Sequence, residues 1–399
     1  MRQIYQIVGS VTAASVVCAV VLKYFELPWF WVGLTLASSS FAIAAAVPTS
    51  FRFSVVVIGS VPIAVSIAEL VVAAPPVVSK SLFPQLDLRD ALLGWRPAAS
   101  QVSREIATAD GELIYDVTYS IDQSGHRISP PDQGTAIEGC AFFFADSFVY
   151  GEGVGDQETL PYQVGLKARG RFRVVNFAYA GYGAEHMLAT IERGELATNA
   201  PCDPTHVFYI AQPHHVLRAA GKTDFSVRGP RYRLGTDGTP EYLRTSPDQP
   251  ALIWWQKKLT AQLSKSRVYR ALTMRPTIPT EQDLDLYFAI VRRSFDLLGR
   301  RWPRAQLHVV SWDLQSIYAR DLTTFHDRLK ANGLNVHFIE QILPGYVDDP
   351  ARYSLHRFDL HPNPFALQKV ATYVVERILK ISPQAGQSAQ VRGPASAHR

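Results

Sequence analysis

The sequence predicts an α/β domain, built on a parallel sheet with helices on both faces and preceded by three transmembrane helices. One observation behind this prediction is the charge distribution, because residues 1–79 carry only five charged side chains: Arg2, Lys23, Glu26, Arg52 and Glu69. The other is a regular alternation of short apolar runs with helical stretches from residue 140 onward. We therefore expect a membrane anchor over residues 1–79, followed by a large water-soluble part.

The overall composition is the average of these two parts. The chain has 399 residues, of which 47% are hydrophobic and 19% charged, with a net charge of +5. This apolar content excludes a wholly disordered chain, and three cysteines are too few for a disulfide scaffold. Cys140 and Cys202 could pair in an oxidising compartment, although nothing in the sequence requires it. The positive charge is not gathered into a basic run, so we expect no nucleic-acid partner.

The predicted membrane contact lies within residues 4–74 and consists of three apolar stretches, 4–22, 27–47 and 53–74. Each is about 20 residues long, which is enough to span the hydrocarbon layer as a helix. The third contains Glu69, which we expect to be a helix-end carboxylate reaching the interface; a functional acid within the membrane is the alternative. Three spans place the chain ends on opposite sides, and we expect the large C-terminal domain on the extracytoplasmic side.

Residues 80–139 are expected to form a linker and a β-rich lead-in to the main domain. The proline-containing stretch 75–90 indicates the linker. Residues 112–119 are typical of a strand and are bounded by turn signals at 109–111 and 122–125.

Residues 140–382 are expected to form the α/β domain. Buried strands are predicted at 141–145, 174–178, 206–210, 307–311 and 335–339. Helical patterns lie between and after them, at 159–168, 184–195, 284–298, 322–331 and 364–381. Apolar strands that alternate with helices are typical of a parallel sheet covered on both faces.

Two segments do not follow this alternation. Residues 221–282 contain a hairpin-like turn, Gly-Thr-Asp-Gly at 235–238, and are interpreted as an insertion. This insertion is either a helical cap packed over the sheet or a lid at the substrate site. Residues 383–399 are rich in Pro, Gln, Ala, Gly and Ser, a composition typical of a disordered tail.

Polar residues suited to catalysis follow the predicted strands. In an open α/β sheet, reactive groups gather beyond the carboxyl ends of the strands. The residues at these places are Ser147 after the first strand, Gly181 and Gly183 after the second, Gln212 and His214 after the third, and Asp359 and His361 before the last helix. A serine, an imidazole, a carboxylate and glycine turns are the groups that acyl transfer needs.

The predicted nucleophile is Ser147, with His361 as general base and Asp359 orienting its imidazole. The proline after His361 favours extended backbone, in which residues two apart point to the same side. The oxyanion would be held by the backbone N–H groups of Ser147 and Gly181, with Gly183 as the alternative to Gly181.

Three blocks of the sequence resemble the SGNH/GDSL hydrolase family. The first is Phe-Ala-Asp-Ser-Phe at 144–148 with Gly-Glu-Gly-Val at 151–154. The second is Val-Asn-Phe-Ala at 175–178 with Gly-Tyr-Gly at 181–183, and the last is Asp-Leu-His-Pro-Asn at 359–363.

Residues 93–97 and 119–127 are similar to the lead-in region of membrane-attached bacterial members, so the resemblance covers residues 85–381. It implies a three-layer, flavodoxin-like sheet. It also implies ester hydrolysis or acyl transfer through a serine, a histidine and an aspartate, without a metal or a cofactor.

The chain departs from the family pattern at two places. Ala145 replaces the glycine of the first block, a change that we expect only to adjust packing. The family's third block normally supplies an asparagine as an oxyanion donor, whereas residues 212–215 here are Gln-Pro-His-His. Losing one oxyanion donor typically costs ~10²–10³ in rate. Gln212 or His214 could substitute, since an amide and an imidazole N–H both donate hydrogen bonds.

The sequence therefore predicts a membrane-anchored serine esterase that acts on O-acylated envelope polysaccharide or on a lipid ester. Two alternatives stay open. One is an O-acyltransferase on the same scaffold, and the other is a catalytically weak or inactive binding protein, which the missing asparagine favours.

Overall fold

The computed structural model describes residues 35–37, 39, 40, 43, 47–72, 78–109, 111–131, 136–196, 200, 202–223, 225–245, 259, 263, 266–273, 278–313, 322–346 and 348–382. The chain divides into two compact units. One comprises Met1–Val77 and Asp248–Pro276, and the other comprises Val78–Pro247 and Thr277–Arg399.

The larger unit is built on a five-stranded sheet in which every neighbouring pair is parallel, as the sequence predicts. Its strand order is β12-β11-β8-β6-β7. Counted along the chain, this is the doubly wound order 2-1-3-4-5, typical of flavodoxin-like folds. The strands are β6 (Gly139–Phe144), β7 (Phe172–Asn176), β8 (Pro204–Ala211), β11 (Gln306–Ser311) and β12 (Val336–Phe338).

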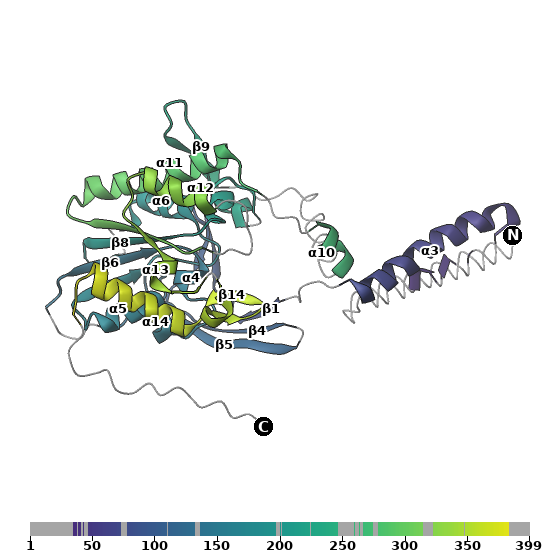
Figure 1. Cartoon of the computed structure of the whole chain (residues 1–399), viewed down its shortest axis with the longest axis horizontal. Coiled ribbons are helices and arrows are strands. Elements are labelled where there is room, and N and C mark those ends of the chain that lie inside the picture. The colour runs from purple at the N-terminus through teal and green to yellow at the C-terminus, as the bar shows by residue number, and fades with distance from the viewer. Residues whose placement is uncertain are drawn as a thin grey trace, which may run out of the picture. The chain divides into compact units, whose positions relative to one another are not determined.

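Helices cover both faces of this sheet and make it a three-layer structure (Figure 1). On one face lie α5 (Leu160–Lys167), α13 (Ile339–Ile342), α14 (Pro364–Tyr373) and the π-helical turn that follows it (Val374–Ile378). On the other face lie α6 (Ala184–Arg193), α8 (His215–Ala219), α11 (Glu281–Arg301) and α12 (Leu322–Ala331).

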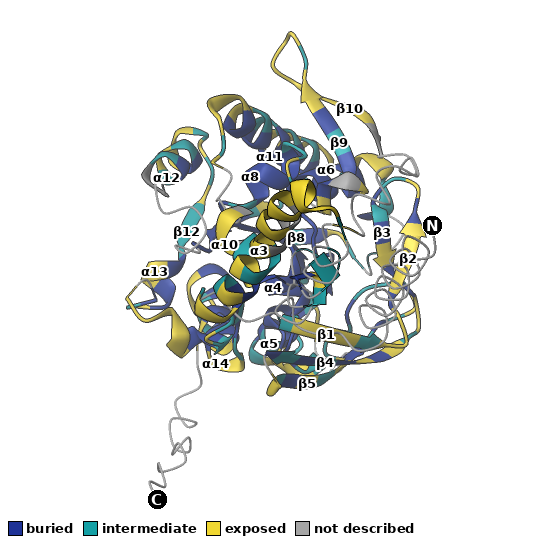
Figure 2. Cartoon of the chain, turned by 90° about the vertical axis from the view of Figure 1, so that its right-hand side faces the viewer, coloured by how far each residue is buried: buried dark blue, intermediate teal, exposed yellow. Residues whose placement is uncertain are grey.

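Alternation along β6 explains why both faces are buried. Ala141 and Phe143 pack with the core of the α14 face, whereas Phe142 and Phe144 pack with the core of the α11 face. Successive side chains of a strand point to opposite faces, so a strand between two helical layers must be apolar throughout. The neighbouring strand β8 is buried at every residue except Thr205, and its visible part is dark blue in Figure 2.

Short-range signals set the beginnings of the helices. Thr280 and Asp283 form a reciprocal capping box at the start of α11, with the Thr280 side chain accepting from the Asp283 N–H. The Asn363 side chain accepts from the Ala366 N–H at 3.0 Å and caps α14. Such caps pair backbone N–H groups that a helix cannot pair internally.

The predicted positions of Asp359 and His361 need one correction. They do not follow a strand of the main sheet, because they lie on β14 (Asp359–Pro362), which pairs antiparallel with β13 (Ser354–His356). The extended backbone predicted there is present. Ile339, predicted to end the fifth strand, instead begins α13.

The lead-in is β-rich, and its strand over 112–119 is present as part of β5 (Glu112–Ser120). It pairs with β4 (Val102–Ala109), which in turn pairs with β1 (Val78–Phe83), all antiparallel. The expected linker over 75–90 is therefore structured from Val78 onward, since residues 78–83 pair with β4. A second hairpin joins β2 (Asp87–Asp90) to β3 (Gly94–Pro97).

Cys140 and Cys202 form a disulfide, which the sequence left open. Their Cα atoms lie 6.0 Å apart, and 62 residues separate them along the chain. The bond joins the beginning of β6 to the segment just before β8, two strands that are neighbours in the sheet.

Part of the 221–282 insertion forms the predicted hairpin. Strands β9 (Pro230–Leu234) and β10 (Pro240–Thr245) pair antiparallel, and the turn between them closes through the Gly235 N–H, which donates to the Thr239 carbonyl at 2.8 Å. The segment 248–276 groups instead with the N-terminal unit. The predicted disordered tail, 383–399, lies outside the described residues.

In the smaller unit, α3 (Thr49–Val71) covers most of the third apolar stretch. The first stretch and most of the second lie outside the described residues. In the part of the chain that the structure describes, no helix has both the length and the apolar character needed to cross a membrane.

Glu69, near the end of α3, is 7% exposed and contacts α10 (Arg267–Thr273). Its carboxylate accepts hydrogen bonds from the Arg267 N–H at 2.8 Å, the Val268 N–H at 3.2 Å and the Ser266 hydroxyl. Glu69 therefore caps a helix almost 200 residues away in sequence, a role that the sequence did not predict.

Candidate active site

Ser147 begins the short helix α4 (Ser147–Tyr150) directly beyond the carboxyl end of β6. Asp146 caps this helix, because its Oδ1 atom accepts from the Phe148 N–H at 3.1 Å. β6 pairs with β7 on one side and β8 on the other, so Ser147 lies where the strand order reverses. This is the switch point at which open α/β sheets bind their ligands.

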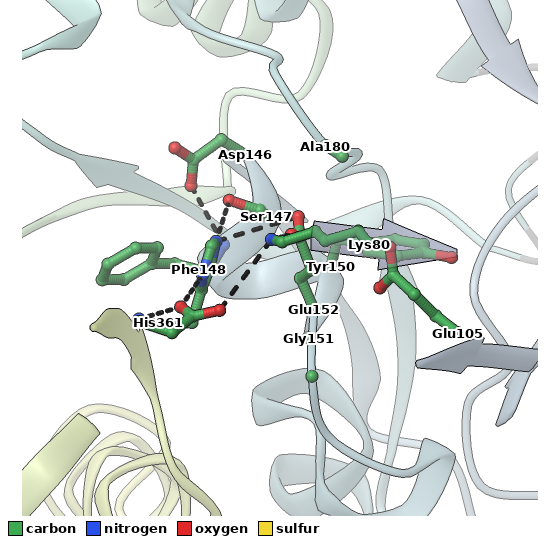
Figure 3. Close-up of polar contacts among 12 residues, drawn as sticks. Lys80, Glu105, Asp146, Ser147, Phe148, Tyr150, Gly151, Glu152, Ala180 and His361 are labelled. Carbon is green, nitrogen blue, oxygen red and sulfur yellow. Dashed lines mark hydrogen bonds and ion pairs between the residues drawn. The ribbon is translucent and has the colours of Figure 1, made fainter. Parts of the chain in front are cut away.

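Ser147, His361 and Asp359 are linked by consecutive hydrogen bonds. Figure 3 shows Ser147 beside His361. Ser147 Oγ lies 2.8 Å from His361 Nε2, and His361 Nδ1 lies 2.5 Å from Asp359 Oδ1. The Asp359 carboxylate can only accept, so Nδ1 carries the proton and Nε2 offers its lone pair to the serine hydroxyl. This is the arrangement of nucleophile, base and orienting carboxylate.

The charges around these three residues favour an ionised Asp359. Burial raises the pKa of Asp359, but the hydrogen bond from His361 and its charge outweigh burial and bring the pKa to about 2. Burial lowers the pKa of His361, whereas the Glu152 charge and the hydrogen bond to Asp359 raise it, and the net shift is upward.

Two charged residues that sequence reasoning missed lie beside the imidazole. Glu152 Oε2 is 3.8 Å from His361 Nε2. Lys80 forms an ion pair with Glu152 (Figure 3). Its Nζ atom lies 3.9 Å from Asp359 Oδ2. Glu152 belongs to the Gly-Glu-Gly-Val run of the first block. Lys80 lies on β1, whose sequence over 78–83 does not alternate between apolar and polar residues, so no pattern signalled that strand.

A cavity of about 720 Å³ opens over Ser147. Its lining includes His361, Gly181, His214, Arg218 and Phe225. The cavity has the volume of an ordinary small-molecule site.

Gly181 needs to be a glycine. Its φ is +81°, and a Cβ there would lie 2.3 Å from the Phe225 ring. Among the described residues, no group accepts a hydrogen bond from the backbone N–H of Ser147 or of Gly181. Gly183, the alternative oxyanion donor, already donates its N–H to His186 Nδ1 at 3.2 Å.

Gln212 does not occupy the position expected of an oxyanion donor. Its side chain is fully buried, and its amide nitrogen lies 3.4 Å from Asp146 Oδ1. The buried Asp146 carboxylate attracts the nearest amide donor, so the prediction of Gln212 as an oxyanion donor is wrong for this arrangement.

His214 lines the cavity, but its donor also faces Asp146. His214 Nε2 lies 3.1 Å from Asp146 Oδ2, and a carboxylate only accepts, so Nε2 carries the proton. Burial and the Arg218 charge lower the pKa of His214 to about 3, so the ring is neutral and Nδ1 has no proton to donate. The prediction of His214 as a donor is therefore also corrected.

The Asp146 carboxylate is surrounded by hydrogen-bond donors from neighbouring side chains. Its Oδ2 atom contacts His214 Nε2, His215 Nε2 at 3.2 Å and Arg218 Nη1 at 2.9 Å. Burial alone would raise its pKa, but Arg218 and the two imidazoles hold the pKa well below its usual range.

Asp146, His214 and His215 have ligand atoms close enough to hold a metal ion. The Arg218 guanidinium already occupies the carboxylate oxygen that both imidazoles share, and its charge would repel a cation.

No protein-family model matches the chain, and neither does any curated protein sequence. Similar solved structures include a G-D-S-L family lipolytic protein from Desulfitobacterium hafniense, at 9% identity and a TM-score of 0.34, covering 59% of this chain and 98% of that one. An acetyl xylan esterase from Butyrivibrio proteoclasticus has 12% identity and a TM-score of 0.34, covering 76% of this chain and 87% of that one. At these identities and TM-scores, neither structure bears on the activity of this chain.

Proposed function

We propose that the chain is a serine-dependent ester hydrolase, with Ser147 as nucleophile, His361 as general base and Asp359 as the orienting carboxylate. The observation that carries this proposal is the 2.8 Å contact of Ser147 Oγ with a His361 ring that Asp359 holds from its other nitrogen. A serine and a histidine beyond hydrogen-bond reach would have favoured a binding protein instead.

In the proposed first step, Ser147 Oγ attacks the ester carbonyl carbon while its proton passes to His361 Nε2. The carbonyl electron pair moves to oxygen, and the N–H groups of Ser147 and Gly181 stabilise the oxyanion. The ester C–O bond then breaks, and His361 returns the proton to the leaving alkoxide. Water then attacks the acyl carbon and gives a proton to His361 Nε2. The acyl C–Oγ bond breaks, the acid leaves, and His361 returns the proton to Ser147 Oγ.

In this proposal the oxyanion has two backbone donors and no side-chain donor, since Gln212 and His214 both face Asp146. We expect turnover ~10²–10³ lower than in a comparable site with a third donor.

The proposal predicts that Ser147→Ala lowers hydrolysis of short-chain aryl esters by on the order of 10⁴-fold or more, because the nucleophile is lost. The measurement uses the full chain purified in detergent, with Ser124→Ala as the matched serine control. A fluorophosphonate probe should label the parent but neither Ser147→Ala nor His361→Ala. Equal hydrolysis by the parent and Ser147→Ala would reject the proposal.

Hydrolysis and acyl transfer share every step up to the acyl-enzyme and differ only in the acceptor. We propose an O-acylated carbohydrate or a lipid ester as the acyl donor, since the cavity over Ser147 is open and large enough for either. Acid released in the absence of any added hydroxyl acceptor supports hydrolysis, whereas turnover only with a sugar acceptor supports an O-acyltransferase.

We also propose that residues 4–74 attach the chain to a membrane, with the α/β unit on the extracytoplasmic side. The uncharged stretches 4–22 and 27–47 support attachment. The disulfide between Cys140 and Cys202 supports the orientation, because such bonds persist in oxidising compartments.

A further inference from the structure

The His361 imidazole lies between two carboxylates. Asp359 contacts Nδ1, and Glu152 Oε2 lies 3.8 Å from Nε2, the nitrogen that also contacts Ser147 Oγ. The catalytic arrangement needs only Asp359, so Glu152 is an additional negative charge at the nitrogen that takes up the serine proton.

Lys80 connects the two carboxylates. It pairs with Glu152 and lies 3.9 Å from Asp359 Oδ2, an oxygen that accepts no hydrogen bond from the described residues. Burial opposes the charge on Lys80, but Glu152 outweighs it and raises the pKa of Lys80. Lys80 therefore stays protonated and can hold Glu152 away from Nε2.

The surrounding elements fix both members of this pair. Arg127, buried behind the loop that carries Glu152, donates to the carbonyls of Tyr150, Gly151 and Val154 at 2.9–3.1 Å. The loop thus holds Glu152 beside His361, and β1 brings Lys80 to Glu152.

Other charged groups also face the pair. Glu105 on β4 accepts hydrogen bonds from Tyr115 and Tyr119 on β5. Burial and the Glu152 charge both raise the pKa of Glu105. Tyr115 lies under Lys80, whose Nζ atom is 5.9 Å from the ring centroid.

We propose that Glu152 and Lys80 are positioning residues that set the basicity of His361: Glu152 stabilises the imidazolium formed when Ser147 loses its proton, and Lys80 limits that effect and keeps Glu152 from capturing Nε2. This inference rests on the function proposed above for the same site. The proton still passes from Ser147 Oγ to Nε2 and from Nε2 to the leaving alkoxide, so neither residue exchanges a proton itself.

The proposal predicts shifts of opposite sign in the two variants. Glu152→Gln removes a negative charge near Nε2, so the pKa of His361 should fall, by about 1 unit. Lys80→Met leaves two carboxylates uncompensated, so the pKa of His361 should rise. His361 acts as a base only when neutral, so the acidic limb of kcat/KM against pH should move downward in Glu152→Gln and upward in Lys80→Met.

The experiment follows the His361 imidazole by NMR in the full chain with isotope-labelled histidine, with the resonance assigned by its loss in His361→Gln. Glu158→Gln is the matched control, since it makes the same substitution at a nearby carboxylate that accepts from the Gly155 N–H and does not face His361. The acidic limb of fluorophosphonate labelling is measured in parallel. Shifts of opposite sign, absent in the control, support the proposal.

Unchanged titration of His361 in both variants, or shifts of the same sign, would overturn it. The NMR titration does not require turnover. A chain that hydrolyses no ester but shows the two opposite shifts would therefore refute the proposed function alone. If one variant fails to give the parent's circular dichroism spectrum, the sign of the shift in the other still decides the question.

Discussion

At the residue scale, Gly181 combines two constraints that no other residue type meets. Its positive φ excludes most side chains, and the Phe225 ring fills the space where a Cβ would lie. Its backbone N–H has no acceptor among the residues that the structure describes, and Gly181 lines the cavity together with Ser147. The proposed oxyanion site thus depends on a conformation and on a contact made by a residue 44 positions later in the sequence.

We expect Gly181→Ala to lower kcat for ester hydrolysis by ~10²–10³, because the displaced N–H no longer reaches the oxyanion. Gly194→Ala is the matched control: Gly194 also has a positive φ, +78°, but nothing lies within 4 Å of its added Cβ. Steady-state kinetics on both variants separate the loss of a donor from backbone strain. A Gly181→Ala rate equal to that of Gly194→Ala would remove Gly181 from the oxyanion site.

Gln212 and His214 show that residue type alone does not decide which acceptor a side chain contacts. Both side chains can donate, and both follow β8 as the sequence predicts. The buried Asp146 carboxylate accepts from each of them, which turns the donors away from the oxyanion position. Which acceptor each donor contacts depends on where the Asp146 side chain lies. A sequence pattern does not contain the distances between these side chains.

At the element scale, three separate sheets supply the groups of the site. The main sheet places Ser147 and Gly181 at its carboxyl edge, and the hairpin of β13 and β14 brings Asp359 and His361 to them. The antiparallel lead-in adds Lys80 from β1. The lead-in is therefore part of the site rather than a spacer before it.

The cap that Glu69 makes on α10 yields a stability prediction for the smaller unit. We expect Glu69→Ala to destabilise α10 by ~1 kcal/mol, because its first N–H groups lose their acceptor. Hydrogen–deuterium exchange of the full chain in detergent should show faster exchange over residues 266–273. Glu69→Gln, which keeps one carbonyl oxygen, should show a smaller change, and Ser60→Ala on the same helix should show none. Unchanged exchange in Glu69→Ala would contradict the capping role.

At the scale of the whole molecule, the proposed attachment to a membrane explains the uneven charge. The first two apolar stretches are uncharged, and α3 exposes large apolar side chains, Phe53 at 79% and Val71 at 77% among them. Figure 2 shows much of α3 as exposed. Apolar surface of this extent is unfavourable in water and indicates contact with lipid or protein.

We expect the full-length chain to remain in the membrane pellet after an alkaline carbonate wash, because embedded apolar helices do not depend on ionic contacts. Immunoblotting of pellet and supernatant measures this, with a known peripheral protein as the control that is released. Recovery of the chain in the carbonate supernatant would reject attachment through residues 4–74.

The sequence by itself determined the parallel sheet and the identity of the three residues in hydrogen-bond contact at its edge. Long apolar strands need cover on both faces, and the carboxyl ends of parallel strands meet at one edge, so periodicity and order along the chain are sufficient for this inference. Ser147 was predictable on this ground. Asp359 and His361 lie on a separate antiparallel hairpin, and they were predicted from the extended segment before the last helix and its resemblance to a family block.

Only the tertiary structure decided the partners of each polar group. Lys80 reaches Asp359 across 279 residues of sequence, Cys140 pairs with Cys202, and Glu69 caps α10. Hydrogen bonds and ion pairs act over a few ångströms, and such distances between remote residues arise only when the elements have packed. For the same reason, the charges that surround His361 became visible only once β1 and β14 lay beside α4.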